Sequence, residues 1–541
     1  MRLLRVNGQD VDLDDKTAIG VTFQALDLKD PGKRKVKYTN TFNIPATAKN
    51  RNIFGHPGNP HSIDQIVYDS LQCDYWDSNL HVIKNGRIRV EEASDRISLF
   101  VIEKPDVWEA IKLLTFKQFS YDFFQWLQIP KAETPFVGSF TNFVSAYANA
   151  TEGVYLPLFY SNLYGVLENN QYVEDTNRIV LNHNSKSNGG HFTVFYKTIF
   201  EFIEEKYGVN FMTGGGVVPG NIWDDQFAKA AFHSFRSLTV AMKYDTGGNV
   251  IGYYFLLPDS PIFMPHEDTE EMGGKSLYDV VNCFFQHFNI LIDEIELSAS
   301  TVIRLARWDD IQNAEVVDWS GGVVGYPKFR PRIDGYAQEN KIKFSSIYPD
   351  GSEDVNCRIL KSLNKNLDAK VDLFEIDSYI PASIVDNGPA VLDLSVPESF
   401  ETNVFMVNSG NKRAVTVVLT DGYSSISTGI ELNIAAVYSL SGEYQFLESA
   451  IKYPKYYELT KWLTIYDIIG IEFFKQYWIQ ELGASFFINK IPGFNPSKGK
   501  QAVKLELFKI SDTAPVYPDG IDYYTDGIGD YWTDGTGDYY F

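Results

Sequence analysis

The densest group of residues that could do chemistry is the segment 266–271, His-Glu-Asp-Thr-Glu-Glu, in which four carboxylates follow an imidazole. Such side chains can bind zinc, but this kind of zinc site needs a second imidazole at helical spacing. The segment has no second imidazole, and it lies between Pro265 and Gly273. An exposed acidic loop explains the same residues without a ligand, so we expect no metal here.

Three other candidates for catalysis lack the rest of their motif. Residues 213–216, Thr-Gly-Gly-Gly, follow a predicted strand but lack the Lys-Ser/Thr of a phosphate-binding loop. The cysteines Cys73, Cys283 and Cys357 are odd in number and unrelated in spacing, which argues against a disulfide framework or a zinc ribbon. Residues 308–310, Trp-Asp-Asp, are the best acidic pair for glycoside cleavage and fit a strand end better; other pairs stay open. We therefore predict a protein that is not an enzyme and binds no cofactor.

Charge and composition narrow the class of protein. The chain of 541 residues carries 48 Lys and Arg against 70 Asp and Glu, a formal net charge of −22. This charge argues against a protein that grips nucleic-acid phosphates, because that role needs a basic surface. No apolar run approaches about 18 residues and no signal peptide begins the chain, so we expect no membrane anchor and synthesis in a cytoplasm. Aromatic residues make up 15%, which favours strands and large contact surfaces.

Residues 21–28 and 36–44 alternate apolar and polar side chains, and this period of two predicts a pair of strands with one covered face. The alternation places Phe42 on the covered face and Thr39 on the open one. Residues 30–32, Asp-Pro-Gly, have the composition of a turn between the strands. A basic tip follows the turn and is our first candidate for subunit or partner contact: Lys33, Arg34, Lys35 and Lys37. We expect this tip to face water or an acidic partner.

The second of these strands runs into residues 41–55, Thr-Phe-Asn-Ile-Pro-Ala-Thr-Ala-Lys-Asn-Arg-Asn-Ile-Phe-Gly, where Gly55 is an expected helix C-cap. A strand hairpin that leads into this motif resembles the start of a family of tail structural proteins from tailed phages and prophages of Bacteroidota, including crAss-like phages. Members of that family look like tail or baseplate hub proteins. The resemblance covers motifs spread over most of the chain and includes no catalytic signature. It implies two small barrel-like units with pseudo-symmetry, so that a trimer could match a six-fold tail tube.

The predicted fold class is β-dominated α+β, with several domains, small β-barrel or sandwich units and a few amphipathic helices. In the first part of the chain, Asn85-Gly86 between two alternating segments predicts a hairpin turn. Residues 130–190 show no clear period, and we expect long loops there. The predicted domains are an N-terminal β-domain (1–103), a helical and loop-rich connector (104–190), an α+β hub-like region (191–310), a β-rich domain (311–460), a closing helix and hairpin (461–514) and an aromatic repeat tail (515–541).

Two predicted helices each lead straight into a strand, which suggests two related α+β units. The first spans 193–207 and ends at Gly208, a C-cap glycine. The second begins at Ser276, where Asp279 lies three residues on, as in a capping box. Farther along, the alternating segments 486–492 and 503–508 are expected to form a closing hairpin.

The last part of the chain is an eight-residue repeat in which residues 522–529, 530–537 and 538–541 align. Aromatic pairs and Asp-Gly steps predict short strands and tight turns. The aromatic residues are our second candidate for subunit or partner contact: Tyr523, Tyr524, Tyr531, Trp532, Tyr539 and Tyr540. We favour a tail that docks on a partner's sheet, or a self-contained cap, over Ca²⁺ binding, because the aspartates lack the spacing of an EF-hand loop.

These observations together predict a virion structural protein, a tail or baseplate hub that forms an oligomeric ring, most simply a trimer or hexamer. The ring would connect the tail tube or tail barrel to other tail, baseplate or fibre proteins, after synthesis in the bacterial host cytoplasm. Genome DNA would pass through without tight binding, because acidic side chains that line a lumen repel it. Two alternatives stay open: a carbohydrate-binding or depolymerising tail protein, and the hub of a phage-derived contractile injection particle.

Overall fold

The computed structural model describes the chain in stretches separated by gaps. The described residues are 2–24, 38–61, 65–68, 71–103, 106–114, 116–148, 150, 153–155, 160–161, 166–168, 171–173, 178–181, 193–211, 232–234, 239–256, 276–297, 300–306, 311, 314–331, 335–344, 357–376, 383–384, 390–392, 413–419, 422–428, 444–472, 474–511, 524–525 and 531–532.

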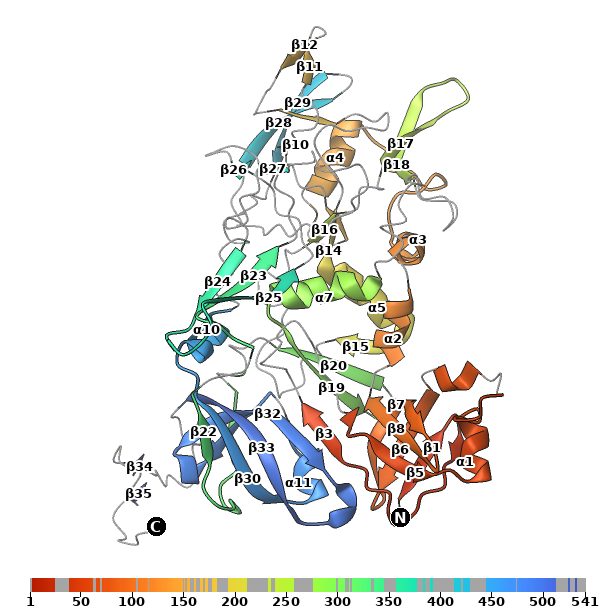
Figure 1. The fold of residues 1–541 in the computed structure, drawn as a ribbon. Helices are drawn as coiled ribbons and strands as arrows, with labels where there is room; N and C mark the ends of the chain where they lie inside the picture. The colour runs from red at the N-terminus through yellow and green to blue at the C-terminus, as the bar shows by residue number, and fades with distance from the viewer. Residues whose placement is uncertain are drawn as a thin grey trace.

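One large sheet of 14 strands dominates the structure (Figure 1). Its main path is β2-β1-β6-β7-β8-β4-β3-β32-β33-β30-β22, with β5 on β8, and β31 on β32 and β21. The strands are β1 (Leu3–Val6), β2 (Gln9–Asp10), β3 (Val21–Gln24), β4 (Tyr38–Thr39), β5 (Phe42–Pro45), β6 (Leu71–Asp77), β7 (Leu80–Ala93), β8 (Arg96–Glu103), β21 (Val316–Asp318), β22 (Lys328–Arg330), β30 (Tyr456–Leu463), β31 (Gln476–Ile479), β32 (Ala484–Phe494) and β33 (Gln501–Ser511). Because β3 pairs with β32, strands from the N-terminal and the C-terminal parts of the chain lie side by side in one sheet. Among the described strands no closed barrel forms, and the β-dominated α+β class is confirmed.

The closing hairpin β32–β33, predicted from alternation, is confirmed, and its strands face two cores. Phe508 lies opposite Tyr456 on one side and Phe487 on the other, and all three side chains are buried in the core that also contains the long helices. The alternate residues Leu505 and Leu507 are buried in the core of the N-terminal strands. Successive strand residues point to opposite faces, so this part of the sheet joins the two cores.

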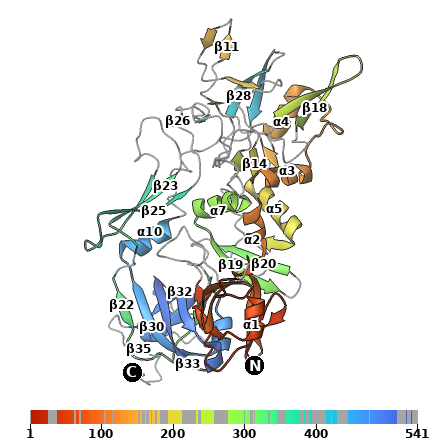
Figure 2. The same ribbon diagram turned by 45° about the vertical axis from the view of Figure 1, so that its right-hand side comes forward.

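The two predicted helix-to-strand units are confirmed, and they meet in one small sheet. Helix α5 (Tyr196–Tyr207) ends at Gly208, whose φ of 63° is left-handed, and continues into β15 (Val209–Phe211). Helix α7 (Leu277–His287) begins with the predicted capping box and leads to β19 (Leu291–Leu297), which pairs with β20 (Ser300–Ala306). Strand β15 pairs with β20 in turn, so both units contribute to the order β15-β20-β19. In both views α5 and α7 lie between the large sheet and the small sheets that contain β11 (Val166–Glu168) and β28 (Arg413–Leu419) (Figures 1 and 2).

Several smaller elements complete the described structure. The other helices are α1 (Ala48–Ile53), α2 (Asp106–Leu113), α3 (Phe116–Trp126), α4 (Phe140–Ala148), α10 (Gln445–Lys452) and α11 (Ile465–Ile469), with short 3-10 turns at Gln65–Tyr68, Gln480–Leu482 and Pro496–Lys498. The small sheets are β16 (Phe232–Ser234) with β14 (Thr193–Phe195) and β9 (Val154–Tyr155); β17 (Thr239–Tyr244) with β18 (Val250–Leu256); β24 (Cys357–Lys361) with β23 (Glu339–Phe344) and β25 (Lys370–Ile376); β10 (Tyr160–Ser161) with β27 (Ala390–Leu392) and β26 (Ser383–Ile384); β13 (Arg178–Leu181) with β28 (Arg413–Leu419) and β29 (Gly422–Thr428); β11 (Val166–Glu168) with β12 (Gln171–Val173); and β34 (Tyr524–Thr525) with β35 (Tyr531–Trp532). No helix of the described residues is long and apolar enough to cross a membrane.

The hairpin turn predicted at Asn85-Gly86 is wrong. The chain turns instead at Ser78 and Asn79, both of which have positive φ (50° and 67°), as a two-residue type I′ turn requires. Asn85 also has positive φ (48°), but it lies inside the long strand β7, where the register with β6 shifts. A Cβ at Gly86 would lie 2.8 Å from Ile83 Cγ2, so close packing rather than a turn requires this glycine.

Two further predictions need correction. Residues 130–190, expected to be loops, contain helix α4, in which Phe143 and Tyr147 lie one turn apart with ring centroids 5.0 Å from each other. Thr39, expected on the open face of its strand, is buried, and its hydroxyl accepts a hydrogen bond from Val101 N at 2.9 Å. The alternation fails because the strand breaks between β4 and β5. The six predicted domains stay predictions.

Candidate functional site

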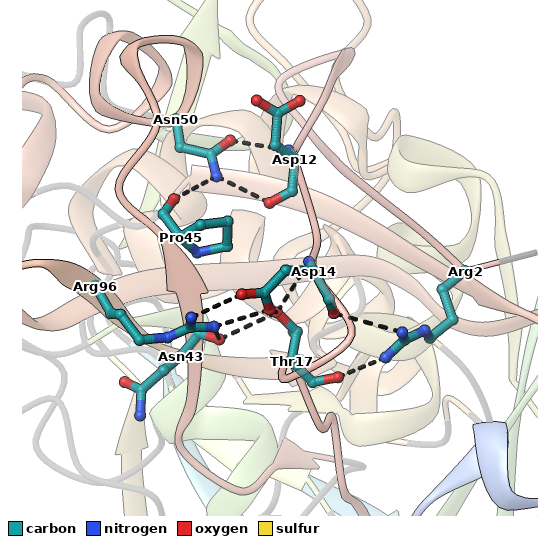
Figure 3. Close-up of polar contacts among 8 residues, drawn as sticks. All are labelled: Arg2, Asp12, Asp14, Thr17, Asn43, Pro45, Asn50 and Arg96. Carbon is teal, nitrogen blue, oxygen red and sulfur yellow. Dashed lines mark hydrogen bonds and ion pairs between the residues drawn. The ribbon is translucent and has the colours of Figure 1, made fainter.

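The motif at residues 41–55 is held by a buried asparagine (Figure 3). Asn50 is fully buried in α1. Its Oδ1 accepts a hydrogen bond from Asp12 N at 2.9 Å, and its Nδ2 donates to Asp12 O at 2.9 Å and to Pro45 O at 2.8 Å. One side chain therefore joins the end of β5, helix α1 and the segment after β2.

The residues around Asn50 extend this network. Thr47 is the N-cap of α1: its hydroxyl accepts from Asn50 N at 3.1 Å and donates to Asp12 Oδ2 at 2.8 Å. Lys49 Nζ lies 3.2 Å from Asp12 Oδ1. The hydrogen bond from Thr47 and then that from Lys49 lower the pKa of Asp12. The hydroxyl of Thr47 thereby satisfies one of the free N–H groups at the start of α1, and Asp12 holds that hydroxyl in place.

A second carboxylate secures the other side of the motif (Figure 3). Arg96 donates to the two oxygens of Asp14 at 2.7 and 2.9 Å and to Asn43 O at 2.9 Å. Thr17 donates to Asp14 Oδ1 at 2.6 Å, and Arg2 donates to Thr17 O at 2.5 Å. The bidentate geometry is the strong form of an arginine–carboxylate pair. The hydrogen bonds from Arg96 and Thr17 therefore lower the pKa of Asp14.

The low pKa of Asp14 predicts a specific loss of stability in acid. Stability from this carboxylate is fully present above the unfolded pKa of about 3.9 and is lost as the pH falls through the lower folded pKa. In urea unfolding, the wild-type protein should be more stable than Asp14→Asn at pH 6, and the difference should shrink steadily below pH 4. The exposed neighbour Asp15 gives the control Asp15→Asn. A wild-type advantage over Asp14→Asn that is unchanged by acid would contradict this assignment.

This network anchors the base of the predicted hairpin and offers no reactive group. Strand β5 pairs with β8, β8 pairs with β4, and β4 pairs with β3, so the motif is tied to both strands of the hairpin. On its other side β3 pairs with β32, and Gly493 N donates to Thr22 Oγ1 at 3.1 Å. The Asn50 side chain binds backbone groups, and the Asp12 and Asp14 carboxylates bind neighbouring side chains, which is the arrangement of a scaffold.

The predicted contact residues can be placed only in part. Lys33, Arg34, Lys35 and Lys37 lie outside the described residues, as do Tyr523, Tyr539 and Tyr540. Tyr524 and Trp532 lie opposite each other in β34 and β35, and Tyr531 lies opposite Thr525. The short strands expected in the repeat are therefore present. The role of all these residues in contact stays a prediction.

The residues considered for chemistry give no assembled centre in the described part of the chain. Residues 213–216, 266–271 and 308–310 lie outside the described residues. No group of His, Cys, Asp and Glu side chains that could hold a metal ion occurs among the residues that are described. Cys73 and Cys283 are buried and not joined in a disulfide, and burial raises the pKa of Cys73 above its ordinary value. A buried thiol with a raised pKa is a poor nucleophile.

Sequence analysis missed an ordered but exposed stretch on the outer edge of the large sheet, which we call the edge segment (residues 319–331). Strand β22 within it pairs with β30, and Val324 N donates to Thr460 O at 2.8 Å. Tyr326 is 99% exposed and Phe329 is 52% exposed. The available signal was the alternation of aromatic, basic and proline residues at 326–331, Tyr-Pro-Lys-Phe-Arg-Pro.

A buried lysine holds the edge segment in place. Lys461 is 5% exposed, and its ammonium donates to Trp319 O at 2.6 Å, to Ser320 O at 3.3 Å and to Gly321 O. Burial lowers the pKa of Lys461, while three nearby carboxylates raise it by a smaller amount. Gly321 N donates in turn to Glu481 Oε1 at 2.9 Å. The carbonyl groups of this loop therefore converge on one cation, which fixes the backbone that leads to the exposed aromatic residues.

No protein-family model and no curated protein matches this chain. Among solved structures, it is similar to the 43 kDa tail protein of prophage MuSo2 from Shewanella oneidensis, with a TM-score of 0.33, 8% identity, and coverage of 95% of this chain and 99% of that one. It is also similar to the tail protein from Neisseria meningitidis MC58, with a TM-score of 0.32, 10% identity and coverage of 95% and 99%. The third is a chain of the Francisella PdpA-VgrG complex, with a TM-score of 0.31, 8% identity and coverage of 96% of this chain and 53% of that one. These structures are tail proteins or contain VgrG, but TM-scores this low do not establish a shared fold.

Proposed function

We propose that this chain is a non-enzymatic structural protein of a phage tail, a hub that assembles as a homo-oligomeric ring and joins the tail tube to distal tail components. The observation that carries the proposal is the anchored base of hairpin β3–β4. Residues of the motif that resembles tail hub proteins help to fix this base: Asn50 donates to Pro45 O, and Asn43 O accepts from Arg96, which also binds Asp14. Such rigid support suits a hairpin that makes contact with another molecule, because a preorganised segment loses little conformational entropy on binding.

Charge supports contact between identical chains. The basic tip carries Lys33, Arg34, Lys35 and Lys37, whereas the whole chain has a formal net charge of −22. A basic tip is attracted to the acidic surface of a neighbouring copy, and a contact between two different surfaces of the same chain closes into a ring when the rotation allows it. Acidic side chains around the opening would then repel DNA and prevent it from sticking.

Reversing charge at the tip tests this proposal. We expect the wild-type protein to form closed rings with masses well above the 61.4 kDa of one chain, seen by native mass spectrometry and negative-stain averaging. Lys33→Glu/Lys35→Glu should shift the protein towards monomers, most strongly at low salt, where surface charge matters most.

The matched control is Lys498→Glu/Lys500→Glu, which makes the same change in charge at two exposed lysines in the connection between β32 and β33. Rings that form equally well in both double variants would remove the tip from the contact. A wild-type protein that stays a monomer at every concentration, alone and with tail-tube proteins, would reject the hub itself.

A further inference from the structure

The edge segment has the properties of a preformed binding surface. It ends the order of the large sheet among the described strands, and Figure 1 shows β22 on the outer side of β30. Lys461 and Glu481 fix its first turn, while β22 is tied to β30 through Lys328 opposite Glu458 and Phe329 opposite Tyr457. Its exposure therefore does not come from a loose backbone. Contiguous exposed apolar surface on a soluble protein often marks a site of contact with a partner.

The side chains of the edge segment define the chemistry of that partner. Tyr326 and Phe329 present aromatic surface, with the Phe329 and Tyr457 ring centroids 5.3 Å apart. Lys328 and Arg330 add two cations on an exposed strand. Arg330 contacts Glu458, which Lys504 also approaches at 2.7 Å, so this carboxylate is shared between two cations. The surface is thus aromatic and basic, and it fits an occupant that is aromatic and acidic.

Prolines limit how the occupant binds. Pro327 and Pro331 flank β22, and a proline has no backbone N–H to donate to a new strand. A long strand cannot add to this edge, so side chains rather than a continuous backbone ladder must supply most of the contact. Such protection of an edge also prevents indiscriminate pairing between sheets.

The chain itself contains a segment of the required composition. Residues 512–541 carry seven aspartates, no lysine or arginine, and the aromatic pairs of the repeat. The strands β34 and β35 form only a two-stranded pair, which has little stability in water without a surface to pack on. We propose that the C-terminal repeat of one copy docks on the edge segment of a second copy, through aromatic contact with Tyr326 and Phe329 and attraction to Lys328 and Arg330.

The tail that docks on the edge segment is assigned to a second copy, because the edge segment stays exposed in the single chain, where the side chain of Tyr326 is 99% exposed. The contact joins two different surfaces, so each copy offers one tail and one edge. Copies joined in this way form a ring when the rotation closes and an open chain when it does not. The formation of a ring rests on the proposed function. The contact between the tail of one copy and the edge segment of the next does not depend on it.

Complementation between two variants tests the contact directly. The first variant lacks residues 515–541, which leaves β33 (Gln501–Ser511) intact. The second is Tyr326→Ser/Lys328→Glu, which changes two exposed side chains. Each variant alone should lose assembly, with at least about a tenfold weaker association, as expected for the loss of an interface hot spot. When both variants also carry Lys33→Glu/Lys35→Glu, so that the tip contact is removed, an equimolar mixture should form a 1:1 complex and nothing larger, because only one tail and one edge remain to join.

The control variant is Tyr68→Ser/Lys16→Glu, which makes the same pair of substitutions at residues that are also exposed; it should assemble like the wild-type protein. The contact is wrong if either test variant assembles normally, if the mixture stays monomeric, or if the wild-type protein is a monomer throughout. Docking of the tail on its own chain would show as a monomeric mixture in which only the tail deletion raises hydrogen exchange at residues 319–331. If the wild-type protein formed open chains in place of rings, the contact between tail and edge segment would stand and the proposed hub would be wrong. If rings persisted in both variants, the hub would stand and this contact would be wrong.

Discussion

Phe284→Ala is expected to lower the free energy of unfolding by about 3–5 kcal/mol, the range for removing a large aromatic side chain from a packed core. Phe284 lies on α7 and is fully buried. Its ring centroid is 5.0 Å from that of Tyr196 and 5.4 Å from that of Phe200, both on α5, and 4.8 Å from that of Phe288. Alanine would leave a cavity between the two helices that support the sheet β15-β20-β19.

Urea unfolding, followed by far-ultraviolet circular dichroism, measures this effect. Phe284→Leu is the matched control: it keeps an apolar side chain, and we expect it to cost about 1–2 kcal/mol because the volume is partly conserved. Tyr326→Ala, at an exposed ring, should stay within about 0.5 kcal/mol of the wild-type protein. A loss below about 1 kcal/mol for Phe284→Ala would mean that α5 and α7 do not pack through this ring.

The predictions from sequence succeeded where the structure is set by neighbouring residues. The capping box at Ser276 and Asp279 involves residues three apart, and Gly208 ends α5 through its own backbone angle. Both signals act within one helical turn, so no distant contact was needed to recognise them. Asn85-Gly86 shows the limit of such signals: Asn85 has a positive φ, but it lies inside β7, where the register with β6 shifts, and no turn forms there.

The arrangement of the large sheet could not be predicted, because its key pairings join residues far apart in the sequence. Val21 lies opposite Phe494, and Val316 lies opposite Gln476. Alternation identifies a strand and its buried face, but it does not identify the strand's neighbour. The edge segment was missed for the same reason: its support comes from Lys461, 142 positions after Trp319.

The polar network around Asn50 depends on both local and distant residues. Its motif at residues 41–55 is visible in the sequence, but its hydrogen bonds involve Asp12, 38 positions away from Asn50. We expect Asn50→Ala to lower the free energy of unfolding by about 2–4 kcal/mol, because partly buried backbone groups each lose a hydrogen bond and such a loss costs about 1–3 kcal/mol. The groups left without Asn50 are Asp12 N, Asp12 O and Pro45 O.

Asn52→Ala is the control for Asn50→Ala, because Asn52 lies on the same helix and its side chain is exposed; it should change the stability by less than about 0.5 kcal/mol. Equilibrium urea unfolding measures both variants, and equal stability would show that the network does not hold α1 in place. Ring formation gives a second measurement that separates anchoring from folding. If Asn50 acts by fixing the base of hairpin β3–β4, Asn50→Ala should assemble poorly even at low temperature, where the chain is still folded. Normal assembly of the folded variant would mean that the hairpin does not need this anchor, and the proposed contact would then have to lie elsewhere on the chain.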